Sequence, residues 1–281
     1  MLVLKKLFLF FIPLMVLSPA VVPAEWSGIV AFGDSFTDTG NFYAATDESF
    51  PPSPPNYEGR YCDGPVWVEL LPEELGQPDL PLTVYAMGGA MSGEAPFPPG
   101  MRTQVELYLG TFTADPDALY VLFIGSNDYV TRVTRGFAPQ PDDPFVTEVV
   151  GNVESSVETL AAAGARHFLL LDLPDLSTFP MNYDGKYPGL QEYVLQHNTL
   201  LESTTTALLD TLPDSEIILF DTWTYYEQIR ANPAQYGFTD ITWPCLDGQT
   251  PCNSPETHFF WDAIHPTHRA HEILAEEVAP L

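Results

Sequence analysis

The sequence places a serine, a histidine and a carboxylate where they could form a nucleophilic site. Ser35 follows the apolar run of residues 29–32 and Gly33, which predicts a buried strand ending in a tight turn. Near the C-terminus, Asp262 precedes His265 by three residues. In a turn, this spacing lets the carboxylate reach one imidazole nitrogen and leaves the other free to accept the serine proton. Each pattern alone is also typical of an ordinary hydrogen-bonded serine or of a solvated acid beside a surface histidine.

Alternating strand-like and helix-like segments predict the framework that positions these residues. Apolar runs predict five strands, at residues 28–32, 83–87, 118–124, 167–172 and 216–220. Helical patterns occupy residues 66–75, 103–109, 145–163, 190–212 and 267–278. The alternation favours an α/β fold with a mostly parallel sheet covered on both faces. The loops after the first four strands leave the edge that carries Ser35, so they are expected to build a pocket there.

The first 24 residues are typical of a secretory signal peptide. Lys5 and Lys6 precede an apolar run at residues 7–17, and residues 22–24, Val-Pro-Ala, offer a cleavage site with small residues. An uncleaved membrane anchor is the alternative, although Pro13 and Pro19 interrupt a segment already short for a bilayer. We therefore expect residues 1–24 to be removed and residues 25–281 to form one secreted, extracellular or periplasmic, domain without stable membrane insertion.

Charge and cysteine content narrow the classes of partner. The formal net charge is −28, and loss of Lys5 and Lys6 with the signal peptide would make it −30, so binding to nucleic acid is not expected. In an oxidising compartment Cys245 and Cys252 are expected to pair, closing a small loop with a gain of about 2 kcal/mol. Cys62 is then left over, and a buried unpaired thiol is the ordinary interpretation.

Four short blocks, taken in order, resemble one known family. They are Gly33-Asp34-Ser35, Gly88-Gly89, Gly125-Ser-Asn127-Asp128 and Asp262-Ala-Ile-His265. Together they resemble the GDSL family, also called SGNH hydrolases, over essentially all of residues 25–281. The similarity is closest to plant-type GDSL esterases and bacterial lecithinase/haemolysin-like lipases, on Phe-Gly-Asp-Ser-x-x-Asp-x-Gly-Asn, Gly59-Arg-Tyr, Gly64-Pro-Val-Trp-Val and Phe-Trp-Asp-x-x-His-Pro-Thr. The resemblance implies a three-layer α/β/α sandwich with a central, mostly parallel, five-stranded sheet of flavodoxin-like type.

The resemblance also implies a role for each candidate site residue. Ser35 would be the nucleophile, His265 the general base and then acid, and Asp262 the residue that fixes the imidazole tautomer. The backbone N–H groups of Ser35 and Gly89 and the side-chain amide of Asn127 would form the oxyanion hole. Loss of one such donor typically costs about 3 kcal/mol of transition-state stabilisation.

Two positions depart from the family pattern. The second block commonly reads Asn, four residues, then Gly, which selects Gly89 over Gly88, but Val84 stands where that asparagine is expected. Phe36 replaces the leucine of the family name, another apolar residue. Asp34 is expected to brace the turn.

These features predict a serine esterase or lipase that hydrolyses small-molecule or lipid esters through an acyl-enzyme, with neither a cofactor nor a metal. A carbohydrate acetylesterase of the same mechanism and a non-catalytic secreted binding protein that keeps the fold are the alternatives. The spacing of His265, His268 and His271 suggests a metal site, but Pro266 marks a turn that takes His265 off the helical face of the other two. His167, His197 and His258 are interpreted as structural or exposed. Trp223, Tyr225 and Tyr226 either line the pocket or pack in the core.

Overall fold

The structure is a computed structural model that describes residues 26–281. The predicted signal peptide, residues 1–24, lies outside the described residues. Within residues 26–281, no helix is both long enough and apolar enough to cross a bilayer.

Five parallel strands form the central sheet, in the order β2-β1-β3-β4-β5. They are β1 (Ile29–Gly33), β2 (Leu82–Val84), β3 (Leu119–Phe123), β4 (His167–Leu171) and β5 (Glu216–Phe220). All residues of β1 and β3 are buried, which explains why these strands are continuous apolar runs without alternation. The predicted flavodoxin-like α/β sheet is confirmed.

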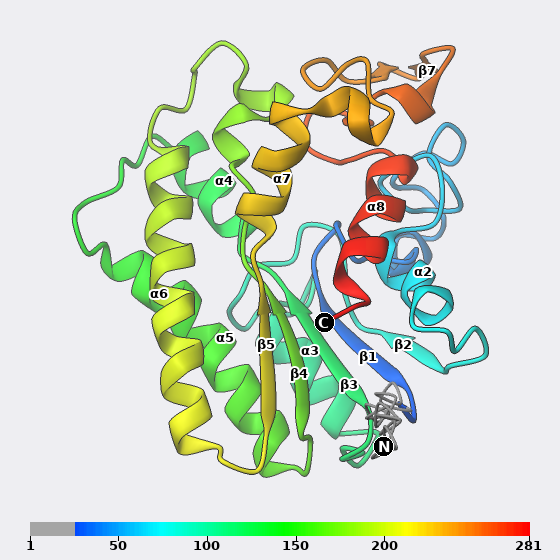
Figure 1. The fold of residues 1–281 in the computed structure, drawn as a ribbon. Helices are drawn as coiled ribbons and strands as arrows, with labels where there is room; N and C mark the ends of the chain where they lie inside the picture. Colours follow the sequence, from blue (N-terminus) through cyan, green and yellow to red (C-terminus); the bar gives the residue numbers. More distant parts are fainter. Residues whose placement is uncertain (1–25) are drawn as a thin grey trace, which may run out of the picture.

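Helices cover both faces of the sheet (Figure 1). They are α1 (Asn41–Ala45), α2 (Trp67–Glu74), α3 (Met101–Leu109), α4 (Ser126–Thr134), α5 (Pro144–Ala162), α6 (Leu190–Thr211), α7 (Thr222–Ala231) and α8 (His268–Val278). Helices α3, α5 and α6 pack side by side in one layer, and α2 packs against α8 in the other. A short antiparallel hairpin, β6 (Leu246–Asp247) and β7 (Thr250–Pro251), lies beyond the end of the sheet where the strands finish (Figure 1).

The structure differs from the sequence-based expectations in the short helix α1, the hairpin β6–β7, two longer helices and one strand. Helices α4 and α7 were not predicted, because both are rich in β-branched and aromatic residues of low helix propensity. Regular strand geometry in β2 ends at Val84, yet Tyr85 N–H still donates to Ala31 O (2.8 Å) and Met87 N–H to Gly33 O (3.1 Å). The predicted second strand therefore continues as hydrogen bonds to β1 without regular strand geometry.

Strands β1 and β3 end opposite each other at the carboxyl edge of the sheet. Gly33 pairs with Phe123, and a Cβ atom at position 33 would clash with the Phe123 carbonyl oxygen. Glycine therefore permits the close approach of β1 to β3. In this strand order the direction of the connections reverses between β1 and β3, and the crevice beyond their carboxyl ends is where open α/β sheets bind ligands.

Asp172, just after β4, predicts a measurable dependence of stability on pH. It accepts hydrogen bonds from the backbone N–H groups of Thr222 (2.6 Å) and Trp223 (3.2 Å). Burial, together with the charge of Asp221, raises the pKa of Asp172 to about 7. Since an unfolded aspartate titrates near pH 4, the folded state keeps a proton that the unfolded state loses. The free energy of unfolding should therefore fall as the pH rises from about 4 to 7.

Asp172→Asn keeps an acceptor for both N–H groups and removes the titration. We expect wild type to lose up to about 3 kcal/mol more unfolding free energy than this variant between pH 4.5 and 8, as measured by urea unfolding. Asp214→Asn, which removes an exposed carboxylate before β5, controls for the change in net charge. Parallel pH profiles for Asp172→Asn and wild type would contradict the assignment.

Candidate active site

The turn after β1 presents Ser35 at the carboxyl edge of the sheet. Asp34 closes this turn: its backbone carbonyl accepts from Thr37 N–H (3.0 Å) and its Oδ1 from Phe36 N–H (3.1 Å). Burial raises the pKa of Asp34 to about 7. Asp34 therefore braces the turn, as expected, and Ser35 itself is 6% exposed.

A continuous chain of hydrogen bonds joins Ser35, His265 and Asp262. Ser35 Oγ lies 2.8 Å from His265 Nε2, although the two residues are 230 positions apart. His265 Nδ1 lies 2.8 Å from Asp262 Oδ2 and 3.0 Å from Oδ1. The carboxylate also accepts the N–H groups of Ile264 and His265, both at 2.8 Å, so its orientation is fixed. Such an arrangement can move a proton from the serine hydroxyl to the imidazole.

The surroundings keep the carboxylate charged and the imidazole enclosed. Burial alone would raise the pKa of Asp262, but His265 and the backbone donors outweigh it and hold that pKa below its usual value. The rings of Tyr61 and Phe36 lie 4.9 and 5.8 Å from the His265 ring, measured between centroids. His265 is 8% exposed, so its ring opens to solvent only narrowly.

Asn127, at the start of α4, and Gly89, in the loop after β2, lie on two segments that are tied together at the same edge. Asn127 occupies the first turn of α4, where its Nδ2 donates to Ala90 O (3.0 Å). The next residue, Asp128, accepts from Ser92 N–H (3.0 Å) and Ser92 Oγ (2.9 Å). Gly89 has φ +76°, a left-handed conformation that favours glycine.

Asp38 and Asn41, for which the sequence suggested no role, join the segment after Ser35 to the segment that leads to Gly88 and Gly89. Asp38 accepts from the N–H groups of Gly40 (2.8 Å) and Asn41 (2.6 Å), and also from that of Gly88 (2.7 Å). The Asn41 side chain donates to the carbonyl oxygens of Val84 and Ala86, both at 2.9 Å. Asn41 thus holds the segment in which the family pattern expects an asparagine at position 84. Both residues lie within the Asp-x-Gly-Asn motif, which was the available signal.

Buried Gln104 was also missed. Its side chain accepts from Gly33 N–H (2.9 Å) and donates to the carbonyl oxygens of Gly33 (2.8 Å) and Pro99 (2.9 Å). It therefore fixes the last residue of β1, two positions before Ser35. A lone glutamine in a helix gives no sequence signal for this contact.

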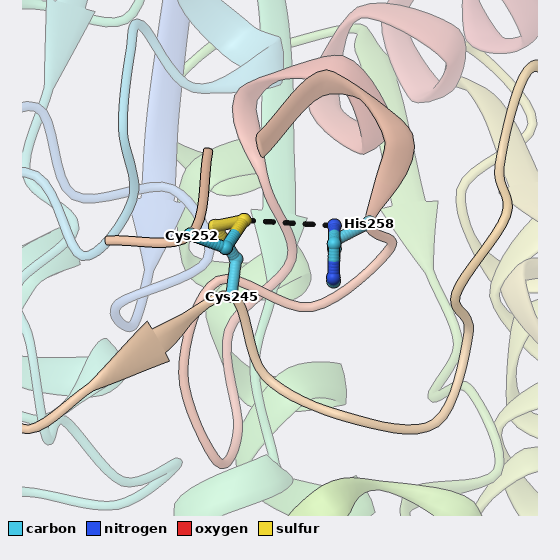
Figure 2. A group of neighbouring side chains, drawn as sticks. All are labelled: Cys245, Cys252 and His258. Carbon is cyan, nitrogen blue, oxygen red and sulfur yellow. Dashed lines mark hydrogen bonds between the residues drawn. A yellow bond between two sulfur atoms is a disulfide. The ribbon is translucent and has the colours of Figure 1, made fainter. Parts of the chain in front are cut away.

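The predicted disulfide, Cys245–Cys252, is present and supports the segment that precedes Asp262. Cys245 N–H donates to Phe260 O (2.9 Å) and Leu246 N–H to Trp261 O (2.7 Å). Cys62 is free and buried, as expected. His258 Nδ1 lies 3.6 Å from Cys252 Sγ (Figure 2). These three residues are the one group of possible metal ligands that clusters in the described part of the chain, and two of them are joined in the disulfide.

The remaining candidates separate into distinct environments. His265 precedes α8, whereas His268 and His271 lie within it, so the three histidines do not share a helical face. Burial lowers the pKa of His271 to about 3. Tyr226 is buried and packs with its ring 4.9 Å from that of Phe259, and Tyr225 lies 5.8 Å from Phe220, both distances between ring centroids. These tyrosines are packing residues rather than part of the Ser35 site.

Known proteins share this fold and these sequence blocks. The family model described as "GDSL-like Lipase/Acylhydrolase" matches residues 29–278. The chain is 28% identical to a thermolabile hemolysin of Vibrio parahaemolyticus over 92% of this chain, and the match spans 64% of the hemolysin. It is 26% identical to a phosphatidylcholine-sterol acyltransferase of Aeromonas hydrophila, with 90% of this chain and 89% of that protein covered.

A solved structure of a lipolytic G-D-S-L family protein from Veillonella parvula has the same fold. The TM-score is 0.52 at 18% identity, with 89% of this chain and 94% of that chain covered. The sequence and fold comparisons agree over almost the whole described chain. This chain therefore belongs to the GDSL-like lipase/acylhydrolase family and is a carboxylic ester hydrolase.

Proposed function

We propose that this protein is a secreted serine esterase that hydrolyses carboxylic esters through an acyl-enzyme on Ser35, without a cofactor. The hydrogen-bonded chain from Ser35 Oγ through His265 to Asp262 is the observation that carries the proposal. The predicted signal peptide at residues 1–24 and the Cys245–Cys252 disulfide support secretion.

In the first half-reaction, Ser35 Oγ attacks the ester carbonyl carbon while its proton passes to His265 Nε2. Asp262 stabilises the imidazolium that forms and keeps Nδ1 protonated. The tetrahedral intermediate then collapses, and His265 returns the proton to the departing alcohol oxygen. In the second half-reaction, water gives a proton to His265 Nε2 and attacks the acyl-Ser35 carbonyl carbon. His265 then returns that proton to Ser35 Oγ as the acyl–oxygen bond breaks, which releases the carboxylic acid and restores the serine hydroxyl.

Three donors are proposed to stabilise the oxyanion: the N–H groups of Ser35 and Gly89 and the Asn127 amide. Within residues 26–281, neither backbone N–H donates a hydrogen bond, so both are free for a substrate oxygen. Asn127 uses one amide hydrogen on Ala90 O and has a second to offer. Gly89 is exposed, whereas the Gly88 N–H already donates to Asp38. We therefore assign the second backbone donor of the oxyanion hole to Gly89 rather than to Gly88.

The intact hydrogen-bonded chain argues against a binding protein without catalysis. One relative carries the name phosphatidylcholine-sterol acyltransferase, which describes transfer of an acyl group to an alcohol instead of to water. An acyl-Ser35 intermediate would permit such a transfer here if an alcohol replaced water in the second half-reaction.

Substitution of Ser35, His265 and Asp262 should separate their roles in the reaction. Ser35→Ala and His265→Ala should each abolish turnover of a soluble nitrophenyl ester, and Asp262→Asn should retain weak activity through a misoriented histidine. Circular dichroism should show all three folded. His167→Ala, a histidine at the start of β4 that pairs with Glu216 at the opposite edge of the sheet, should retain full activity. Full activity in either catalytic alanine variant, or failure of an organophosphonate to label Ser35, would reject the mechanism.

Asn127→Ala tests the oxyanion hole. Loss of one donor that acts only in the transition state should lower kcat about 100-fold or more, equivalent to about 3 kcal/mol, with little change in KM. Steady-state kinetics with the same ester provide the measurement, and the melting temperature checks the fold. A kcat within threefold of wild type would remove Asn127 from the proposed hole.

A further inference from the structure

Four aromatic rings form a connected strip that begins at the catalytic imidazole. The Tyr61 ring lies 4.9 Å from the His265 ring, Phe50 lies 6.2 Å from Tyr61, and Phe42 lies 6.1 Å from Phe50, all measured between ring centroids. Phe97 continues the series, stacked on Phe42 at 5.5 Å. We call Phe42, Phe50, Tyr61 and Phe97 the aromatic strip.

The strip also borders the loop that carries the proposed oxyanion donor. A Cβ atom at Gly88 would clash with the Tyr61 hydroxyl and ring, so Tyr61 lies against this loop as well as against His265. Pro98, the residue after Phe97, lies close to Gly89: a Cβ atom at position 89 would be 3.6 Å from Pro98 Cγ. An ester held between His265 and Gly89 would therefore have this strip beside it.

Two members of the strip are open to solvent. Phe50 is 51% exposed and Phe97 is 55% exposed, while Tyr61 and Phe42 are half-buried. Large exposed phenylalanines that continue from a reactive centre provide apolar area that a ligand can cover. The strip thus leads from the enclosed imidazole to open surface.

The strip is chemically neutral. Burial raises the pKa of the Tyr61 hydroxyl above its usual value, so it remains protonated. The neighbouring Arg60 guanidinium is held by Glu69, with its Nε 3.2 Å from Oε2, and by Glu58, 3.8 Å from Nη1. The strip therefore suits a hydrocarbon group rather than a charged or polyhydroxylated one.

We propose that the aromatic strip is the subsite for a hydrocarbon chain of the ester, and that Phe50 and Phe97 set the preference for chain-bearing esters over acetyl esters of small or sugar alcohols. This inference rests on the proposed esterase function of Ser35. The chain can belong to the acyl group or to the alcohol, since both meet at the carbonyl carbon beside His265 and Gly89. In either case each methylene laid against one side of the strip should raise kcat/KM about twofold.

Three aliphatic esters without an aromatic group test the subsite: methyl acetate, methyl hexanoate and hexyl acetate, each kept below its solubility limit and followed by pH-stat titration. Wild type should show a kcat/KM at least about tenfold higher for one of the six-carbon esters than for methyl acetate. A higher value for methyl hexanoate places the acyl chain on the strip, and a higher value for hexyl acetate places the alcohol chain there.

Phe50→Ala and Phe97→Ala should each reduce that ratio about threefold to fivefold, and the double variant should remove most of it. Phe112→Ala is the matched control, because the Phe112 ring is 52% exposed and stacks on Tyr108. Phe112 lies between α3 and the start of β3, at the end of the sheet opposite to Ser35. This control should leave the ratio unchanged.

The outcomes separate this inference from the function on which it rests. If wild type hydrolyses none of the three esters, or if Ser35→Ala remains active, the proposed function fails. If wild type hydrolyses all three with similar kcat/KM, or if both phenylalanine variants keep the wild-type ratio, the esterase assignment stands and the subsite is rejected.

Discussion

The hydrogen bond between Ser35 Oγ and His265 Nε2 is the interaction on which the rest of this structure depends. It closes at 2.8 Å between residues 230 positions apart, so a small displacement of either segment would break it. The serine follows β1, a strand whose five residues are all buried. The histidine follows a segment without regular structure, and Trp261 fixes this segment. The backbone N–H of Trp261 donates to His265 O (2.8 Å), and its indole N–H donates to Asn56 Oδ1 (2.8 Å).

Irregular loops at the site are held in place by buried polar side chains. Asp38 and Asp128 each bond to backbone groups of a loop distant in sequence, and Gln104 bonds to the last residue of β1. Burial raises the pKa of Asp38 and raises that of Asp128 to about 6, which is the penalty for enclosing a carboxyl group. The N–H donors offset that penalty and in return fix loop positions that apolar packing alone would leave loosely defined. Removing one of these side chains would leave buried N–H groups unpaired, so their effect extends beyond a single bond.

The sequence predicted the framework well because that part of the fold is encoded locally. Strands β1 and β3 are buried on both faces, so each appears as an uninterrupted apolar run, and β5 matched its predicted boundaries. The order of the four family blocks then brought the right loops to one edge. The contacts that lock those loops were not predictable, because the partner of Asp38 lies 50 positions away and has no distinctive side chain. The aromatic strip could not be predicted for the same reason, since Phe42 lies in α1, Phe50 and Tyr61 lie between α1 and α2, and Phe97 lies between β2 and α3, with no periodicity between them.

The charge of the molecule and the neutrality of the strip act on different species in the proposed reaction. The ester group is uncharged, so the net charge of the protein neither attracts nor repels it, and the rings beside His265 are proposed to supply the affinity through apolar contact. The product is a carboxylate. A strongly negative surface disfavours its return to the site, while loss of the ester bond ends the interaction with the oxyanion donors. The acidic surface therefore favours release of the product, and the specificity of the proposed site is left to uncharged groups such as Phe50 and Phe97.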